Sequence, residues 1–409
     1  MNRRAARGVR GLMAAAVAVA AQAIGGMPAA RAADGVFEIP VIESLTGSGA
    51  FLGTQEHDAL VILEKSVNKS GGIHGQPIRF AFHDDQSNPQ VAVQITSGIV
   101  AEQPPVIIGS SLVSACNAMG PLVKGGPVMY CHSAGIHPPA GGYVFTSSVS
   151  TLDQAHALIR YFRMKGWTRL ALATSTDATG QDADRGFDAL LANPENADIK
   201  LVERVHFNIN DVSVAAQMEH VRAAGPQAFI VWSTGSPAGT IFRGLVQAGI
   251  TLPVGTTGGN MTYEQMKQFA AFLPKELYLP SSLWPVAQKG RVPLDAEVER
   301  LQKEFFAAYA EAGKTPDEGS VLAWDPGLII VEALRKLPPG ATAQQLRDTL
   351  LHLKGQPGID GIYDYEKTPQ RGLSLDETLV TRWMPEAGLW DVVSQPTGIP
   401  LGATTAVAH

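Results

Sequence analysis

The stretch ESLTGSGAFLGTQEHDALVILEKSVNKSGG, residues 43–72, predicts the end of a buried strand, a glycine-rich turn and an amphipathic helix. Leu60, Leu63 and Val67 recur at helical spacing, and the glycines at 71 and 72 form a stop signal after the helix. The same order of elements occurs where open α/β proteins bind nucleotides. Two interpretations of the turn are therefore open: a phosphate cradle, or a turn that serves another ligand.

The spacing of the glycines argues against the phosphate cradle. Gly47, Gly49 and Gly53 are one residue further apart than the dinucleotide fingerprint requires, and Asp84 and Asp85 follow about thirty residues later, where roughly 20 are expected for an acid that holds a ribose. A helix N-terminus at the carboxyl edge of a parallel sheet nevertheless remains a place where α/β folds bind small ligands.

Outward from this stretch, the chain alternates short apolar runs with helical segments. Buried strands are predicted at 36–43, 77–84, 105–109 and 127–131. The pattern restarts after residue 154, with strands at 168–174, 199–207, 227–234, 252–257 and 276–282 and with helices at 179–192, 211–224, 237–248 and 262–272, where Asp211 is the expected N-cap. Long helices at 294–312 and 319–336, a shorter one at 342–353 and late strands follow. This order predicts two α/β lobes with mainly parallel sheets, between which the chain crosses more than once.

The N-terminus predicts an export signal over residues 1–33. Four arginines precede an apolar run at 11–26, and Ala30-Arg31-Ala32 has the small-residue pattern of a cleavage site, so we expect cleavage near Ala32 or Ala33. The run is shorter than the ~20 residues that a membrane-spanning helix needs. Cleavage removes five arginines and no acid, which changes the net charge from −6 to −11. We therefore expect a periplasmic protein with no nucleic-acid partner and no direct membrane insertion.

Catalytic and metal-binding patterns are weak. His132, Ser133, Ala134 and Gly135 resemble half of a nucleophile elbow, but Cys131 stands where a glycine is required. The run 83–85, His-Asp-Asp, alternates faces on a strand and lacks a second ligand group. The sequence therefore predicts no enzyme, no cofactor and no metal site, with an exported serine hydrolase using Ser133 as a minor alternative.

The sequence contains two cysteines, Cys116 and Cys131. In an oxidising compartment such a pair favours a disulfide, and two buried thiols are the alternative.

Several ordered blocks resemble the periplasmic solute-binding proteins of branched-chain amino acid ABC importers. They are the turn LTGSGAFLG, the helix end NKSGGIHGQPI, the segment DDQSNPQVA and later VIIGS, GPVMYC and IFRGLVQAGI, so the resemblance covers most of the chain and weakens after about residue 285. It implies a type I periplasmic binding fold with two lobes, crossovers near 147–154, 280–286 and 356–362, and closure over a small ligand. The implied lobes are residues 34–150 plus 284–357 and residues 151–283 plus 358–409.

The resemblance also implies the ligand-binding residues. In this family the ligand carboxylate is held by amides and hydroxyls of the first lobe, here at the turns 110–114 and 133–135. Carried over by position, the candidate ligand-binding residues are Phe51, Ser111, Val113, Ser114, Ser133, Ala134, Gly135, Thr179, Gly235, Ser236, Thr257 and Asp325.

One departure from the family concerns the ligand's ammonium group. Amino-acid binders of the family place a carboxylate where this chain has Thr257. Because a buried ammonium without an opposite charge is costly, the missing acid disfavours a plain amino acid, unless Glu43, Asp177 or Asp325 replaces it.

The sequence therefore predicts a monomeric binding component of an ABC importer whose partners are a small-molecule ligand and an inner-membrane permease. An aromatic or other organic acid is favoured as the ligand. The alternatives are an amino-acid receptor and a ligand-sensing periplasmic module.

Overall fold

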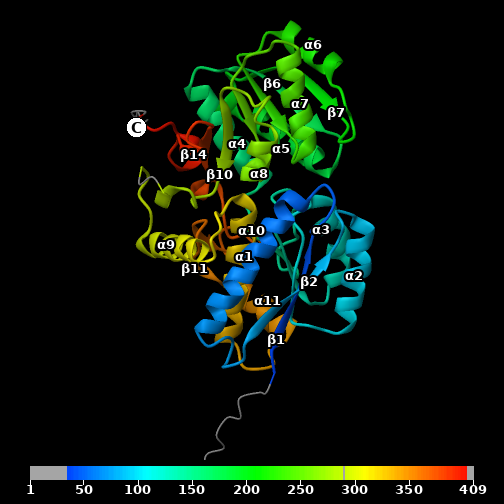
Figure 1. Cartoon of the computed structure of the whole chain (residues 1–409), viewed down its shortest axis with the longest axis vertical. Helices are drawn as coiled ribbons and strands as arrows, with labels where there is room; N and C mark the ends of the chain where they lie inside the picture. The colour runs from blue at the N-terminus through cyan, green and yellow to red at the C-terminus, as the bar shows by residue number, and fades with distance from the viewer. Residues whose placement is uncertain (1–34, 289–290, 403–409) are drawn as a thin grey trace, which may run out of the picture.

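The computed structural model of the chain describes residues 35–288 and 291–402, which form two lobes with one large sheet each (Figure 1). The predicted export signal lies outside the described residues. The first sheet is parallel throughout and has the order β2-β1-β3-β4-β5, from β1 (Phe37–Glu43), β2 (Ile78–Asp84), β3 (Val106–Ile108), β4 (Val128–Cys131) and β5 (Val144–Thr146). Its connecting helices are α1 (Ala50–Lys69), α2 (Pro89–Ala101), α3 (Val113–Met119) and the short η1 (Gly120–Val123).

The second sheet has the order β14-β13-β10-β9-β8-β6-β7. Five strands are parallel: β6 (Arg169–Ser175), β7 (Lys200–Phe207), β8 (Ala228–Trp232), β9 (Val254–Thr256) and β10 (Leu277–Ser281). The late strands β13 (Leu379–Met384) and β14 (Leu389–Val392) add antiparallel to its edge. The helices of this lobe are α4 (Thr151–Met164), α5 (Ala178–Ala192), α6 (Ala215–Ala224), α7 (Ser236–Gln247) and α8 (Tyr263–Gln268), with short turns η2 (Pro194–Asn196) and η3 (Gly258–Asn260).

After β10 the chain returns to the first lobe. This segment contains η4 (Val286–Gln288), α9 (Ala296–Glu311), α10 (Glu318–Lys336), α11 (Ala343–Leu351) and the antiparallel pair β11 (Lys354–Pro357) and β12 (Ile362–Asp364). Helix α10 lies along α1, as Figure 1 shows. The two helices approach closely because Gly327 has no side chain: a Cβ there would lie 2.6 Å from Leu63 Cδ2.

The last crossing between the lobes comes later than the predicted 356–362. The Gln370 amide donates to the carbonyls of Gly142 and Val144, both at 3.1 Å, and accepts from the Gly141 amide at 3.0 Å. These bonds dock the chain on the end of the first sheet up to about residue 372. It enters the second lobe through η5 (Leu375–Glu377) and β13. Glycine and proline interrupt the sequence of this region, so it has no apolar periodicity from which the sheet that it joins could be predicted.

Two further predictions need correction. Helix α6 begins at Ala215 with Val214 as its N-cap, whereas the Asp211 carboxylate accepts the Asn208 amide at 2.8 Å and closes a turn before the helix. Strands β5 and β14, three and four residues long, were not predicted, because runs this short carry little alternation.

The glycines of the opening stretch serve helix–strand packing. A Cβ on Gly53 would lie 2.2 Å from the Ser44 carbonyl oxygen, so only glycine lets α1 start this close to the end of β1. Gly47 has φ +85°, and a Cβ there would meet the Gln86 carbonyl oxygen at 2.7 Å. Gly180 has the same arrangement in the second lobe, where an added Cβ would lie 1.7 Å from the Ser175 carbonyl oxygen.

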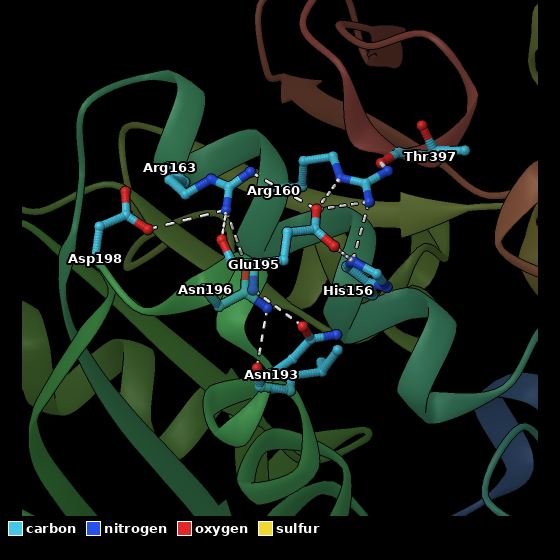
Figure 2. A network of polar contacts seen from close by, with 9 residues as sticks. His156, Arg160, Arg163, Asn193, Glu195, Asn196, Asp198 and Thr397 are labelled. Atoms are coloured by element: carbon cyan, nitrogen blue, oxygen red, sulfur yellow. Dashed lines mark hydrogen bonds and ion pairs between the residues drawn. The ribbon is translucent and has the colours of Figure 1, made fainter. Parts of the chain in front are cut away.

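The C-terminal turn is tied to the second lobe by the polar network in Figure 2. Arg160 of α4 donates to the Glu195 carboxylate at 2.8 and 3.2 Å and to the Thr397 carbonyl at 3.2 Å. Arg163 approaches the same carboxylate at 3.7 Å, and His156 Nε2 lies 3.5 Å from its other oxygen. One carboxylate thus joins helix α4 to η2, while Arg160 also reaches η6 (Pro396–Gly398).

We predict that Arg160→Ala lowers the free energy of unfolding by about 1 kcal/mol, because it removes a charge-assisted bond to a backbone carbonyl together with a half-buried ion pair. Urea denaturation measures this change. The matched control is Arg222→Ala, which removes an i,i+3 pair with Glu219 whose partners are both more than half exposed, and which should change stability by less than about 0.5 kcal/mol. Equal effects of the two substitutions would contradict this role of Arg160.

Candidate functional site

A cavity lies between the two lobes. Its volume is about 70 Å³, several times the roughly 10–15 Å³ that one water molecule needs. The first-lobe wall consists of Leu52, Ser111, Leu112, Val113, His132, Ser133, Ala134 and Gly135. The remaining wall consists of Ser148, Thr151, Gln154, Thr179, Trp232, Thr234, Thr257, Gly259, Glu318 and Leu322.

Strand direction explains why these residues meet. The segments 111–113 and 132–135 follow β3 and β4, whereas Thr179, Thr234 and Thr257 follow β6, β8 and β9. In a parallel sheet all such segments lie at the carboxyl edge, where open α/β folds bind ligands. The cavity therefore lies where the carboxyl edges of the two sheets face each other.

Two serine hydroxyls of the first-lobe wall have no hydrogen-bond partner. Ser111 and Ser133 are 9% and 2% exposed, and neither Oγ atom has a hydrogen-bond partner in the part of the chain that the structure describes. Leaving a buried hydroxyl unpaired costs about 1–3 kcal/mol. Both hydroxyls are therefore available to a polar group of a ligand.

Side chains of the opposite wall are already bonded to one another. The Gln154 amide oxygen accepts from the Gly258 amide at 3.0 Å and from the Thr257 hydroxyl at 3.3 Å, and its nitrogen donates to the Val149 carbonyl at 3.2 Å. The polar side chains of Gln154 and Thr257 in this wall are therefore already engaged in hydrogen bonds.

The apolar part of the wall includes Trp232, the last residue of β8. It is 1% exposed, and Phe187 holds it from behind in an edge-to-face contact at 5.3 Å between ring centroids. Trp232 is the aromatic wall of the cavity.

Glu318 contributes an acidic group that the sequence analysis missed. It is the first residue of α10, is 6% exposed, and accepts the Trp284 indole N–H at 3.1 Å. Burial raises the pKa of Glu318 to about 8; the Trp284 bond opposes this rise and the neighbouring Asp317 adds to it. The Glu318 carboxyl of the ligand-free chain therefore holds a proton at pH 7, and a cationic ligand group would favour its ionised form.

Arg371 fixes the backbone under the first-lobe turn. Its guanidinium, on a side chain that is 6% exposed, donates to the carbonyls of Ala134 at 3.2 Å, Ile136 at 2.7 Å and Ser148. Burial lowers the pKa of Arg371 to about 10, so the side chain is still charged at neutral pH. The last crossing segment thus holds the turn that carries Ser133.

Seven of the candidate residues line the cavity: Ser111, Val113, Ser133, Ala134, Gly135, Thr179 and Thr257. The others lie elsewhere. The Phe51 ring packs against Gly235 across the lobe boundary, where a Cβ on the glycine would lie 2.9 Å from the ring. Ser114 and Ser236 are exposed, and the position that lines the cavity after β8 is Thr234.

The three acids proposed as replacements for the missing carboxylate do not line the cavity. Asp325 accepts the amides of Ile359 and Asp360 and the Tyr363 hydroxyl at 2.9–3.0 Å, which ties α10 to the last crossing segment. Asp177 caps α5 by accepting the Gly180 amide at 3.1 Å. Glu43 is buried at the end of β1 and does not line the cavity.

The lobes also touch outside the cavity. His137 Nε2 of the first lobe lies 2.7 Å from Asp182 Oδ1 of α5. Near the first-lobe turns, Cys116 and Cys131 form a disulfide that joins α3 to the end of β4.

The profile of the periplasmic binding protein family matches residues 37–373. The chain belongs to the periplasmic binding protein family. Similar solved structures show the same two-lobed type I fold. The LivJ substrate-binding protein of a branched-chain amino acid transporter from Streptococcus pneumoniae, in complex with isoleucine, is 20% identical with a TM-score of 0.73, over 88% of this chain and 99% of that one.

Two further relatives have the same architecture. An extracellular ligand-binding receptor from Rhodopseudomonas palustris is 20% identical with a TM-score of 0.77, over 88% of this chain and 99% of that one. The leucine-binding protein LivK from Thermotoga maritima is 17% identical with a TM-score of 0.73, over 87% and 97%. A search of curated protein sequences gave no match. Across the described residues, no helix combines the length and apolarity needed to cross a bilayer.

We predict that Glu318→Gln stabilises the ligand-free protein increasingly as the pH rises. The pKa of Glu318 is about 8 in the folded state and near 4.5 in the unfolded chain, so between these values the folded state binds more protons and stability falls with rising pH. Glutamine removes this contribution and keeps an acceptor for Trp284. At pH 8 the gain should be about 1 kcal/mol or more.

Urea denaturation from pH 5 to pH 8 measures the gain. Glu299→Gln is the control, because Glu299 is an exposed carboxylate on α9 paired with Lys303. Parallel pH profiles for wild type and Glu318→Gln would contradict the assignment.

Proposed function

We propose that this chain is the periplasmic substrate-binding component of an ABC importer and that it captures a small solute carrying both a carboxylate and an amino group. Family membership and the two-lobed fold support the binding role. The predicted export signal at 1–33 and the charge of −11 after its removal support a periplasmic location.

The observation that carries the proposal is the polar character of the cavity wall. Two buried hydroxyls, Ser111 and Ser133, have no partner in the chain, and one buried carboxyl, Glu318, lines the same cavity. Hydroxyl donors suit a carboxylate, and Glu318 suits an ammonium group. The ligand isoleucine of the LivJ relative carries both groups.

Glu318 changes the choice between ligand classes. The sequence favoured an organic acid without an amine because Thr257 replaces the usual carboxylate. Glu318 supplies an acid from a different element, the start of α10, so the reason for excluding an amino acid no longer holds. An acid without an amine is the second candidate, because a protonated Glu318 could donate a hydrogen bond to it.

A binding role without catalysis is part of the proposal. Across residues 35–288 and 291–402, the Ser133 hydroxyl makes no hydrogen bond to a histidine or any other base, and activation of a serine nucleophile depends on such a bond. This supports a receptor over a serine hydrolase.

Calorimetric titration of matched ligand pairs tests the ligand class. We expect L-leucine or L-phenylalanine to bind more tightly than 4-methylpentanoate or 3-phenylpropanoate, which keep the shape and lack the amine. Ammonium binding ionises Glu318, so at pH 7 it should release close to one proton and strengthen as the pH rises toward 8. Titrations in buffers with different ionisation enthalpies measure the released proton.

Glu318→Gln should lower the affinity for the amine-bearing ligand by roughly 100-fold or more and abolish the proton release. The affinity for the amine-free acid should be nearly unchanged. Preferential binding of the amine-free acids by the wild type would favour the second candidate instead.

We further predict that Ser133→Ala lowers the affinity for both the amine-bearing ligand and its amine-free counterpart by roughly 10- to 100-fold. The substitution removes a buried donor to the carboxylate that both ligands carry. The same titrations measure this loss. Ser114→Ala, an exposed serine two residues into α3, is the matched control and should bind as the wild type does. Unchanged affinity in Ser133→Ala would place the carboxylate elsewhere in the cavity.

A further inference from the structure

A second polar cluster lies inside the first lobe, next to the cavity. It consists of Glu43, the last residue of β1, Glu56 in α1 and His132, which directly follows β4. Both glutamates are 0% exposed and His132 is 1% exposed. Only His132 also lines the cavity between the lobes.

The donor atoms of the cluster converge but make no hydrogen bonds within the described residues. One carboxylate or imidazole atom from each residue lies within 4.8 Å of the other two, and His132 Nδ1 is 3.8 Å from Glu56 Oε1. Among the residues that the structure describes, none of the four carboxylate oxygens and neither ring nitrogen has a hydrogen-bond partner. Asp85 Oδ2, which is also buried, has no partner either.

Such a cluster is costly without a further positive charge. Within the described residues, neither glutamate forms an ion pair with a lysine or arginine. Burial raises the pKa of Glu43, and the nearby carboxylates of Glu56 and Asp85 raise it further. Isolated charges of this kind are retained inside proteins when they are paired or coordinate a metal.

We propose that Glu43, Glu56 and His132 form a binding site for a divalent transition-metal ion, with Zn²⁺ as the best fit. Two carboxylates balance its charge, and the imidazole favours zinc over calcium or magnesium, which prefer oxygen ligands alone. Bonds of about 2.0–2.2 Å in a tetrahedron put ligand atoms roughly 3.4 Å apart. The three donor atoms, which lie within 4.8 Å of one another, would move closer to hold the ion.

The position of the site indicates a structural role. The three ligands come from β1, α1 and the turn after β4, and this turn continues into Ser133 of the cavity wall. An ion here would join the helix and both strands directly beneath the ligand-binding turn. Three protein ligands leave one tetrahedral position for water.

The test uses the full mature chain, treated with a chelator, dialysed, and titrated with ZnCl₂ in the absence of any organic ligand. We expect one zinc ion per chain by elemental analysis, a rise of several degrees in the melting temperature, and weaker responses to MnCl₂ and CaCl₂. Glu56→Gln should lower the zinc affinity at least 100-fold and abolish the thermal shift.

His206→Gln is the control for zinc held at the surface, because His206 and Asp184 form a partly exposed pair at 3.0 Å. It should bind one zinc ion as tightly as the wild type. Co²⁺ substitution adds a readout that is independent of stability: tetrahedral absorption bands should appear in the wild type and be lost in Glu43→Gln. Absence of stoichiometric zinc in the wild type, or unchanged zinc binding in Glu56→Gln, would overturn the proposal in favour of carboxyls that share protons.

Discussion

In each lobe, the structure depends on a close contact between the first turn of one helix and the end of the strand that precedes it. At Gly53 and Gly180 any side chain would overlap a strand carbonyl, at 2.2 and 1.7 Å respectively. This tight contact sets the path of the chain from β1 into α1 and from β6 into α5. The carboxyl edges of the sheets consequently carry short turns, and the turns of both lobes meet at one cavity.

The two walls of that cavity differ in their hydrogen bonding. Second-lobe groups such as Gln154 and Thr257 are bonded to each other, whereas Ser111 and Ser133 of the first lobe have no partner within the chain. Ser111 and Ser133 can therefore bond to a solute without breaking a bond within the described residues. Glu318 adds a carboxyl group whose pKa burial raises to about 8, so a cationic ligand group would favour its ionised form.

The cavity and the buried cluster share one element, the turn that follows β4. His132 belongs to the cluster, Ser133 offers a hydroxyl to the cavity, and Arg371 holds the carbonyl oxygens of Ala134 and Ile136. Ligand binding, the proposed ion and the last crossing segment therefore all act on the same few residues.

Local sequence patterns determined the two α/β lobes and most of their strands and helices, because apolar periodicity and turn residues act over a few positions. The family resemblance of the sequence indicated the first-lobe turns that carry Ser111 and Ser133. The residues that complete the site come from long-range packing. Glu318 is the first residue of α10, which follows the return of the chain from the second lobe. After β8, Thr234 lines the cavity and Ser236 does not. Glu43 and Glu56 are 13 residues apart, but His132 follows 76 residues later, and only the packing of the first lobe brings it to the two glutamates. Tertiary structure alone decided which of these side chains lie together, because a local sequence pattern does not predict contacts between residues that are distant along the chain.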